Sequence, residues 1–321
     1  MLDVYITIDT EIWCGDWNNV DASFPEAFRK YIYGPTKQGD YALPATLSIL
    51  QEHGLEGVFF VEPLFSARFG IGALEEIVGL IRDKDQEIQL HLHSEWINEA
   101  RPSLLEEVIS KTPLLTLLNE DQQFKLIQWG LQRLEDAGGG RANAFRAGSY
   151  GANRATLKAL KRNGILFDTS YNLDAINGVH DLSPDELLVQ PKTEEGVCIY
   201  PVSVYRTGDG KGYRNVQITA LSYPELVRYL EFAHDSGWDS VVIVSHNFEL
   251  LSPDKSSVDE IVARRFVKLC HYLDKNRDRY QVKGFKKSLV KDCVQPIPPK
   301  TRIDQVGLRY IEQFLRKIKY A

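Results

Sequence analysis

Cysteine, histidine and methionine are scarce in this chain, and long hydrophobic runs are lacking. Its 321 residues include four cysteines, seven histidines and one methionine. The cysteines stand far apart and form no CxxC pair, which argues against a cysteine-based zinc or redox motif and favours reduced thiols in a cytosolic protein. No uncharged apolar run approaches the ~20 residues that span a bilayer. We therefore expect no stable insertion into a membrane.

An excess of positive charge is also lacking. The net charge is −6 at pH 7 and the isoelectric point is near 5.7. This balance argues against a nucleic-acid or polyanion surface. The first residues, MLDVYITIDTE, run directly into an apolar strand and lack the basic and apolar regions of a signal peptide. We expect a cytoplasmic protein that does not bind nucleic acid.

Hydrophobic periodicity alternates between strands and helices along the chain. Short apolar, β-branched runs are each followed by an amphipathic segment with helical spacing. This order indicates a parallel sheet with helices outside, and closure into an α/β barrel is the economical single-domain solution. The expected strands are 4–8, 55–61, 88–93, 143–146, 165–167, 197–205 and 240–245, and the expected helices are 43–53, 73–82, 120–137, 153–163, 224–236, 258–274 and 301–320.

Most of the chain is expected to form one domain. We predict a barrel over 1–290 that carries insertions at 12–40 and 94–118, the first of them a long structured loop. Segment 281–289 is expected to return briefly as a strand. Residues 291–321 form a proline-rich turn and an amphipathic helix. Its basic face is expected in solvent, and its apolar stripe on the body or on a partner subunit, as in a homodimer.

The stretch EIQLHLHSEW places two histidines at the end of a buried strand. Side chains alternate between the two faces of a strand, so His91 and His93 point the same way. Imidazole is the commonest transition-metal ligand, so a metal site is one interpretation of this pair, and a structural role is the other.

Further polar residues fall at the ends of other expected strands. Asp9, Glu11, Arg146, Asp168 and His246 each follow or close an apolar run. Any one of them has an ordinary structural explanation, such as a cap or a surface ion pair. In a parallel α/β barrel, however, the carboxyl ends of the strands meet at one mouth. We therefore expect these side chains to lie close together.

Together these residues suit a hydrolytic metal site. Catalytic Zn²⁺ typically takes three nitrogen or oxygen ligands, and Glu11 can join the two histidines. Asp9 would then take a proton from a water, with Arg146 holding its carboxylate. His246 can protonate a leaving group near neutral pH. Backbone N–H groups of the turn at 148–151 can hold a developing oxyanion.

These motifs resemble those of the NodB-type polysaccharide deacetylases, the catalytic domain of carbohydrate esterase family 4. IDTE matches the acidic first motif of that family, and EIQLHLHSEW matches its histidine motif. The segment from Arg146 to Gly151 matches its RxPY motif, with Tyr150 at the tyrosine position. FDTS, which contains Asp168, and VVIVSHN, which ends near His246, match the last two motifs.

The resemblance implies a fold, a reaction and a set of roles. The fold would be a distorted (β/α)7 barrel of the glycoside hydrolase/deacetylase type. The reaction would be metal-dependent removal of an N-acetyl group from a carbohydrate. Asp9 would be the base and His246 the acid, and Arg146, Tyr150 and Asp168 would complete the catalytic set. Glu11 and the histidines would bind a divalent metal, Zn²⁺ first, with Co²⁺, Ni²⁺ or Mn²⁺ as alternatives.

Three departures from the family pattern bear on these roles. Thr10 separates the two acids of the first motif, which are usually adjacent. The RxPY motif lacks its proline. The two histidines usually stand four apart, and four residues after His91 stands Glu95. The second ligand of this motif is therefore His93 or, as the alternative, Glu95, and the shared strand face favours His93.

Three functions follow as alternatives. The first is deacetylation of an N-acetylated sugar or glycan precursor in surface-polysaccharide biosynthesis. The second keeps the fold but acts on a non-sugar amide or cyclic amide. The third is an inactive barrel that serves as a binding protein. The aromatic residues of 12–40 either line the mouth and stack on sugar rings, or pack into a small core of their own.

Overall fold

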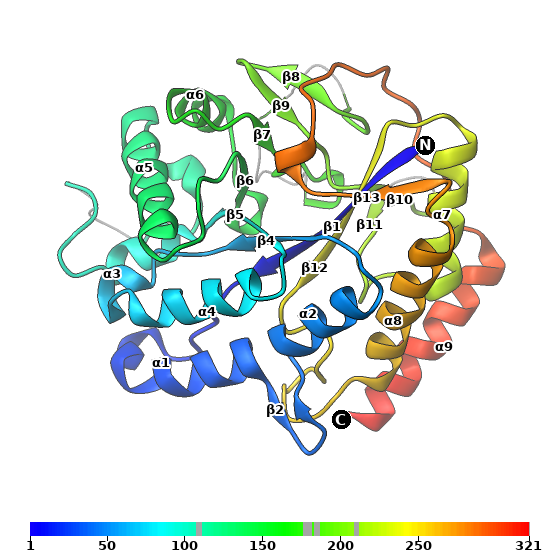
Figure 1. Ribbon diagram of the computed structural model, residues 1–321, viewed down its shortest axis with the longest axis horizontal. Coiled ribbons are helices and arrows are strands. Elements are labelled where there is room, and N and C mark those ends of the chain that lie inside the picture. The colour runs from blue at the N-terminus through cyan, green and yellow to red at the C-terminus, as the bar shows by residue number, and fades with distance from the viewer. Residues whose placement is uncertain (107–110, 176–181, 183–186, 209–211, 321) are drawn as a thin grey trace.

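The centre of the protein is a curved, mostly parallel sheet (Figure 1). The computed structural model describes residues 1–106, 111–175, 182, 187–208 and 212–320. The sheet order is β12-β1-β4-β5-β6-β7-β9-β8, and only β8 (Lys192–Glu194) is antiparallel to its neighbour. The parallel strands are β1 (Leu2–Thr10), β4 (Gly57–Val61), β5 (Glu87–Leu92), β6 (Ala144–Ala147), β7 (Phe167–Asp168), β9 (Val197–Ile199) and β12 (Ser240–His246).

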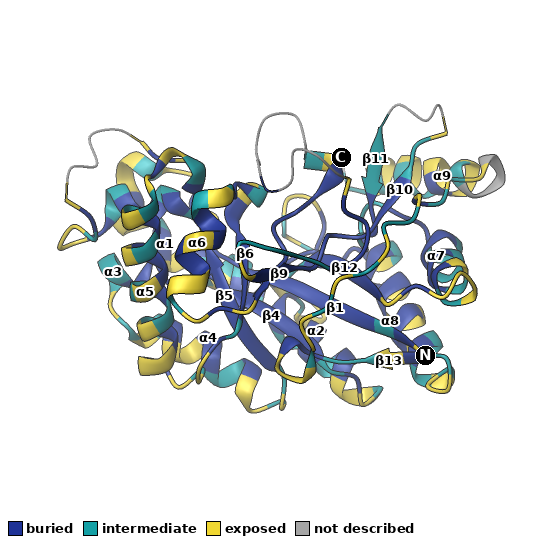
Figure 2. Cartoon of the chain, turned by 90° about the horizontal axis from the view of Figure 1, so that it is seen from above, coloured by how far each residue is buried: buried dark blue, intermediate teal, exposed yellow. Residues whose placement is uncertain are grey.

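The expected helices form on the outside of this sheet, within two residues of their expected limits. Several begin with a reciprocal cap that satisfies their first N–H groups, as Asn119 and Gln122 do for α5. Figure 2 shows their outer faces exposed and the strands buried. These helices are α2 (Leu43–Glu52), α4 (Gly72–Arg82), α5 (Glu120–Asp136), α6 (Arg154–Arg162), α7 (Tyr223–Asp235), α8 (Glu260–Lys275) and α9 (Ile303–Lys319).

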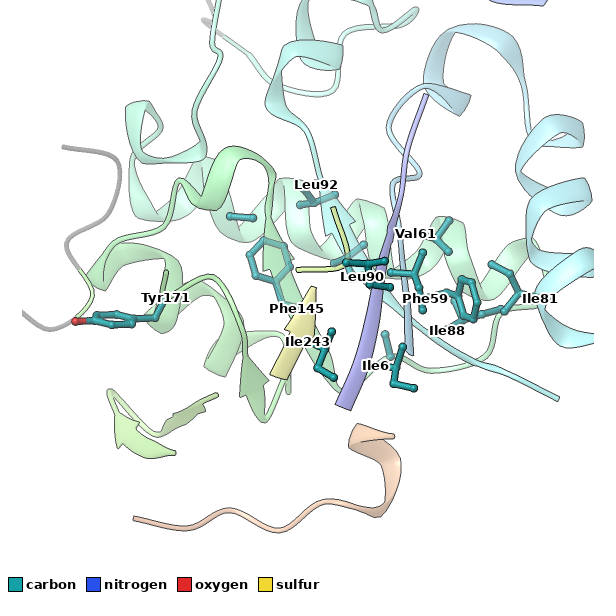
Figure 3. Packing of buried hydrophobic residues seen from close by; sticks show 14 of the residues in the cluster. Ile6, Phe59, Val61, Ile81, Ile88, Leu90, Leu92, Phe145, Tyr171 and Ile243 are labelled. Atoms are coloured by element: carbon teal, nitrogen blue, oxygen red, sulfur yellow. The ribbon is translucent and has the colours of Figure 1, made fainter. Parts of the chain in front are cut away.

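Side-chain alternation divides the strands between two cores. Even-numbered β1 residues such as Ile6 join the large outer cluster beneath the helices, part of which Figure 3 shows. Tyr5 instead joins a second cluster, with residues from β4, β6, β7, β9 and β12. Only the concave side of a curved sheet can bring side chains from so many strands together, so this cluster fills the barrel interior.

The barrel is distorted where β9 approaches β12. The expected strand 197–205 is interrupted at Pro201, and its second part forms β10 (Val204–Arg206), which pairs with β11 (Tyr213–Asn215). The barrel is closed here by single backbone hydrogen bonds instead of a continuous ladder between two paired strands. The Ser203 backbone N–H donates to the Val242 carbonyl at 3.1 Å, and the Val244 N–H donates to the Val216 carbonyl at 3.0 Å. The prediction of a distorted barrel is confirmed.

The regions outside the barrel differ from expectation in two places, 12–40 and 281–289. Segment 12–40 was expected to be a loop but contains α1 (Val20–Phe28), a π-helical turn (Arg29–Tyr33) and a small hairpin, β2 (Pro35–Thr36) and β3 (Gly39–Asp40). Short 3₁₀ turns occupy parts of 94–118, of which 107–110 lie outside the described residues. The expected strand 281–289 is reduced to β13 (Tyr280–Val282), beside the start of β1.

The C-terminal helix α9 also departs from expectation. It packs along α8 (Figure 1), but by its charged side. Arg309 is buried in an ion pair with Glu225, and Arg316 pairs with Asp259. The prediction of a fully solvated basic face is therefore wrong. Across the described residues, no helix combines the length and apolar character needed to cross a membrane.

The short turn after β13 closes the bottom of the barrel interior. Phe285 is fully buried and stacks on Tyr5 with ring centroids 4.7 Å apart. The Glu87 carboxylate holds this turn, because it accepts hydrogen bonds from the backbone N–H groups of Phe285 and Lys286 at 2.7 and 3.0 Å.

We expect Phe285→Ala to lower the free energy of unfolding by about 3–5 kcal/mol, because it removes a buried ring and leaves a cavity. Urea titration of both proteins measures the change. Leu289→Ala, whose side chain is 75% exposed, is the matched control and should shift stability by less than about 0.5 kcal/mol. A loss of less than about 1 kcal/mol for Phe285→Ala would show that the ring does not close the interior.

Candidate metal centre

Glu11, His91 and His93 meet at the carboxyl ends of β1 and β5. His91 belongs to β5 and His93 follows it, so both rings leave the strand on the same side. Glu11 Oε2 lies 3.4 Å from His91 Nε2 and contacts His93 Nε2. One ligand atom from each of the three residues lies within 4.8 Å of the others. The arrangement therefore suits joint coordination of one ion.

The outer nitrogen of each imidazole is held by a second contact. His91 Nδ1 lies 2.8 Å from the Arg146 carbonyl oxygen, to which it donates. His93 Nδ1 lies 3.3 Å from Glu95 Oε2. Both Nε2 atoms are therefore directed toward Glu11. Metal-binding histidines in proteins are oriented in this way by carbonyl and carboxylate groups.

The buried carboxylate of Glu11 needs a positively charged partner. Glu11 is only 4% exposed, and burial by itself would raise its pKa. The charge of His93 and hydrogen bonds from His91 and His93 outweigh burial and lower the Glu11 pKa well below its usual value. A buried carboxylate needs a positive partner, which a shared proton or a divalent cation supplies. Two imidazoles and a carboxylate are a ligand set of catalytic zinc sites, so the residues fit such a cation.

Asp9 and Arg146 form a buried ion pair next to this cluster. Arg146 Nη1 donates to Asp9 Oδ1 at 2.6 Å, as the sequence predicted. The guanidinium also donates to the hydroxyls of Thr7 and Thr169 at 2.9 and 2.6 Å. Its centre lies 4.6 Å from the centroid of the Phe60 ring. These contacts fix the position of Arg146 and orient the carboxylate of Asp9.

His246 approaches Glu11 from the end of β12. Its Nε2 lies 3.8 Å from Glu11 Oε1, and its Nδ1 lies 2.8 Å from Glu249 Oε1. Burial would lower the His246 pKa, but the hydrogen bond to Glu249 and the charge of Glu11 raise it to about 9. The structure thus brings His246 to the same mouth as Glu11 and His91.

Two residues of the site escaped the sequence analysis. Glu249 orients His246, and the one signal in the sequence is a carboxylate three positions after a histidine. Asn247 holds the chain beyond β1, because its Oδ1 accepts from the Glu11 backbone N–H at 3.1 Å. Its Nδ2 donates to the Tyr31 carbonyl at 2.6 Å. No periodicity marks either residue.

The turn from Gly148 to Tyr150 packs directly against His93. A Cβ at Gly148 would lie 2.8 Å from His93 Nδ1, so only glycine fits there. Ser149 and Tyr150 both have positive φ, 52° and 58°. Burial and the charge of Asp9 raise the pKa of the Tyr150 hydroxyl above its ordinary value. Tyr150 lies in the short turn that follows β6, the strand that carries Arg146.

Asp168 takes a different position from the other strand-end residues. Its carboxylate oxygens accept hydrogen bonds from the Ser170 backbone N–H at 2.9 Å and the Ser170 hydroxyl at 2.8 Å. Asp168 thus shapes the turn after β7 instead of joining the Glu11 cluster. Burial raises its pKa to about 6, against the opposing effects of Ser170 and Arg146.

A pocket of about 190 Å³ opens beside the cluster. The aromatic residues of segment 12–40 take different positions. Trp13, which is 55% exposed, and Trp17 line the pocket. Phe24 instead packs on Phe69 with ring centroids 3.7 Å apart and belongs to the large hydrophobic cluster, not to a separate core. The other lining residues are Glu11, Ile12, Cys14, His93, Glu95, Trp96 and Ser149.

We expect the purified protein to retain about one equivalent of a divalent metal. Removal of any one of the three ligands should abolish this binding, as in Glu11→Ala, His91→Ala or His93→Ala. Glu95→Ala should weaken binding only about 10–100-fold, because Glu95 contacts the outer nitrogen of His93. Metal content after dialysis against Zn²⁺, Co²⁺, Ni²⁺ or Mn²⁺ tests this. His271→Ala, on α8, is the control, and unchanged metal in all three ligand variants would exclude the site.

The pH dependence of stability tests the environment of Asp168. An unfolded aspartate titrates near pH 3.9, so the raised folded pKa means that the folded state binds the proton more tightly. This contribution is present at low pH and is lost as pH rises from about 4 to about 6. Relative to Asp168→Asn, the wild type should lose about 2 kcal/mol between about pH 4 and 7. Parallel curves of unfolding free energy against pH for the two proteins would contradict this. Asp83→Asn, at an exposed carboxylate, is the control.

No protein-family model and no curated protein matches this sequence. A solved structure provisionally assigned as a polysaccharide deacetylase, from Mycobacterium smegmatis, matches with TM-score 0.57 and 18% identity over 92% of this chain and 94% of that one. A family 4 carbohydrate esterase from Streptomyces lividans gives TM-score 0.46 and 13% identity over 92% and 97%.

A 4-alpha-glucanotransferase from Thermococcus litoralis also matches, with TM-score 0.52 and 11% identity over 89% of this chain and 40% of that one. At these identities the likeness concerns the fold. The resemblance that the motifs indicated is confirmed at that level, and the chain has the distorted barrel fold of the polysaccharide deacetylases.

Proposed function

We propose that this protein is a metal-dependent hydrolase that removes an N-acetyl group from a sugar or glycan precursor. The carrying observation is the Glu11–His91–His93 cluster, which lies beside the Asp9–Arg146 ion pair at one end of the barrel. The deacetylase fold supports the same reaction class. A bound divalent cation would acidify a water and polarise the amide carbonyl.

Asp9 is the proposed base. Arg146 occupies Oδ1 of its carboxylate, so the second oxygen takes the proton of the attacking water. The buried guanidinium cannot swing away, because Thr7 and Thr169 also hold it. A base fixed in this way keeps its orientation throughout the reaction, which general base catalysis requires.

His246 is the proposed acid. Its Nδ1 is bonded to Glu249, so Nε2, on the side of Glu11, delivers the proton to the departing amine. Glu249 acts as a positioning residue that keeps this imidazole protonated and oriented. The Gly151 N–H already donates to the Gly148 carbonyl, so we assign the oxyanion to the backbone N–H groups of Ser149 and Tyr150.

Two tryptophans are proposed to hold the sugar. The Trp13 ring is exposed at the pocket, and its Nε1 donates to Glu11 Oε1 at 2.6 Å. Trp17 lines the same pocket. Indole rings stack on the C–H faces of sugars while leaving the hydroxyl groups free to form hydrogen bonds. The contact between Trp13 and Glu11 places this stacking surface directly beside the metal ligands.

We expect Asp9→Asn to lower acetate release from N-acetylhexosamine derivatives about 10²–10⁴-fold while bound metal stays unchanged, because Asp9 is the base and not a ligand. Acetate is measured with metal-loaded protein, alongside metal content. Asp83→Asn, at an exposed carboxylate that ends α4, serves as the matched control and should keep the wild-type rate. A near-normal rate for Asp9→Asn would overturn this role.

The behaviour of the metal-loaded wild type tests the substrate class separately. Release of acetate from an N-acetylated sugar supports the proposal. Hydrolysis of a ureide or imide without any acetate would assign the same site to a non-sugar amide. No bound metal and no hydrolysis would instead assign the barrel to binding.

A further inference from the structure

The charged side of α9 faces the body of the protein. Arg309 Nη1 lies 2.6 Å from Glu225 Oε1, and both side chains are buried. Arg316 Nε lies 2.6 Å from Asp259 Oδ2, and Glu312 Oε2 lies 2.6 Å from Arg265 Nη2. Positions 309, 312 and 316 are three and four residues apart, so they form one face of the helix.

The opposite side of α9 presents large apolar side chains to solvent. A surface helix of a globular protein normally turns its apolar face inward and its charged face outward. This helix is therefore reversed, and Figure 2 shows it at the edge of the molecule. We call the exposed set the apolar stripe, and its members, between 39% and 63% exposed, are Leu308, Tyr310, Ile311, Phe314, Leu315 and Ile318.

The ion pairs fix this reversed orientation. Glu225 also accepts from the Ser222 backbone N–H and hydroxyl, at 2.8 and 2.9 Å, and so belongs to the cap of α7. Asp259 caps α8 through the Val262 N–H at 3.1 Å. Turning α9 half way round would cover the stripe but would leave both buried carboxylates without their arginines, which is strongly unfavourable. The stripe therefore stays exposed on the described part of the chain.

We propose that the apolar stripe is the contact surface between two copies of this protein. Leu308, Ile311, Leu315 and Ile318 are spaced three, four and three residues apart, which is the pattern of a helix seam that pairs with another helix. In a twofold contact between identical chains, the same surface of each copy meets itself. A stripe made of apolar side chains alone can pack against a second copy of itself.

The area of the stripe is sufficient for such a contact. If a large side chain presents roughly 200 Å² when fully exposed, the six partly exposed residues hold roughly 600 Å² of surface. Two copies would then remove about 1,200 Å² from water, the lower end of the range for specific interfaces. A patch of this size is at the upper end of the largest apolar patches on monomers, which often serve a function.

The charges around the stripe favour a second copy over a lipid surface. Binding of an interfacial helix to anionic lipids depends on lysine and arginine side chains beside its apolar face. In α9, Arg309, Arg316 and Lys319 are each paired with a carboxylate of the body, which leaves Lys317 as the one exposed base of the described helix outside these ion pairs. The chain as a whole carries a net charge of −6.

Sedimentation velocity and light scattering of the full chain between about 1 and 100 µM test the proposal. We expect a species of twice the 36.5 kDa chain mass that dissociates on dilution. Ile311→Glu combined with Leu315→Glu should give a monomer at every concentration. Val290→Glu combined with Val294→Glu, at side chains 54% and 90% exposed outside α9, is the matched control and should remain a dimer.

The substituted side chains of α9 are exposed, so circular dichroism and the unfolding midpoint of the double variant should match the wild type. A wild-type monomer at about 100 µM, or a dimer that survives both glutamates, would overturn the proposal. Cosedimentation of a monomeric wild type with phosphatidylglycerol vesicles, abolished by the α9 glutamates, would also overturn it in favour of a lipid surface. These experiments measure neither acetate release nor metal content. The proposed dimer and the proposed reaction are therefore tested independently of each other.

Discussion

The ion pair between Arg146 and Asp9 is the contact on which the interior of the barrel depends. Two charges removed from water lose hydration, and they persist only where further hydrogen bonds satisfy the guanidinium. Thr7 and Thr169 provide those bonds, and the Phe60 ring packs on the guanidinium. Because the pair joins β1 to β6, the interaction that ties these strands together also places Asp9 beside the Glu11–His91–His93 cluster.

The parts of the site that follow strand geometry were accessible from the sequence. Alternation along β5 placed both histidines on one side, and Glu11 came to them because parallel strands end at one edge. The same alternation explains why His93 contacts Glu11, whereas Glu95, in the following 3₁₀ turn, reaches the outer nitrogen of His93. Apolar periodicity likewise located the helices of the barrel.

The remaining features depend on contacts between distant segments. Glu249 reaches His246 because the chain turns back after β12, which no local pattern records. Asp168 shared the strand-end position of the other acids, but a serine two residues later captured its carboxylate. In α9 the sequence defined two faces, but amphipathicity alone wrongly placed the basic face in solvent. Buried carboxylates at the caps of α7 and α8 decide that choice.

The carboxylate of Glu11 links the functions of the site through its two oxygens. Oε2 faces the imidazoles of His91 and His93, whereas Oε1 accepts from the Trp13 indole and lies near His246. The two oxygens share one negative charge. A cation next to Oε2 would therefore change how strongly Oε1 accepts hydrogen bonds. The proposed sugar binding at Trp13 and the proposed proton transfer at His246 would therefore both depend on the state of the Glu11 carboxylate.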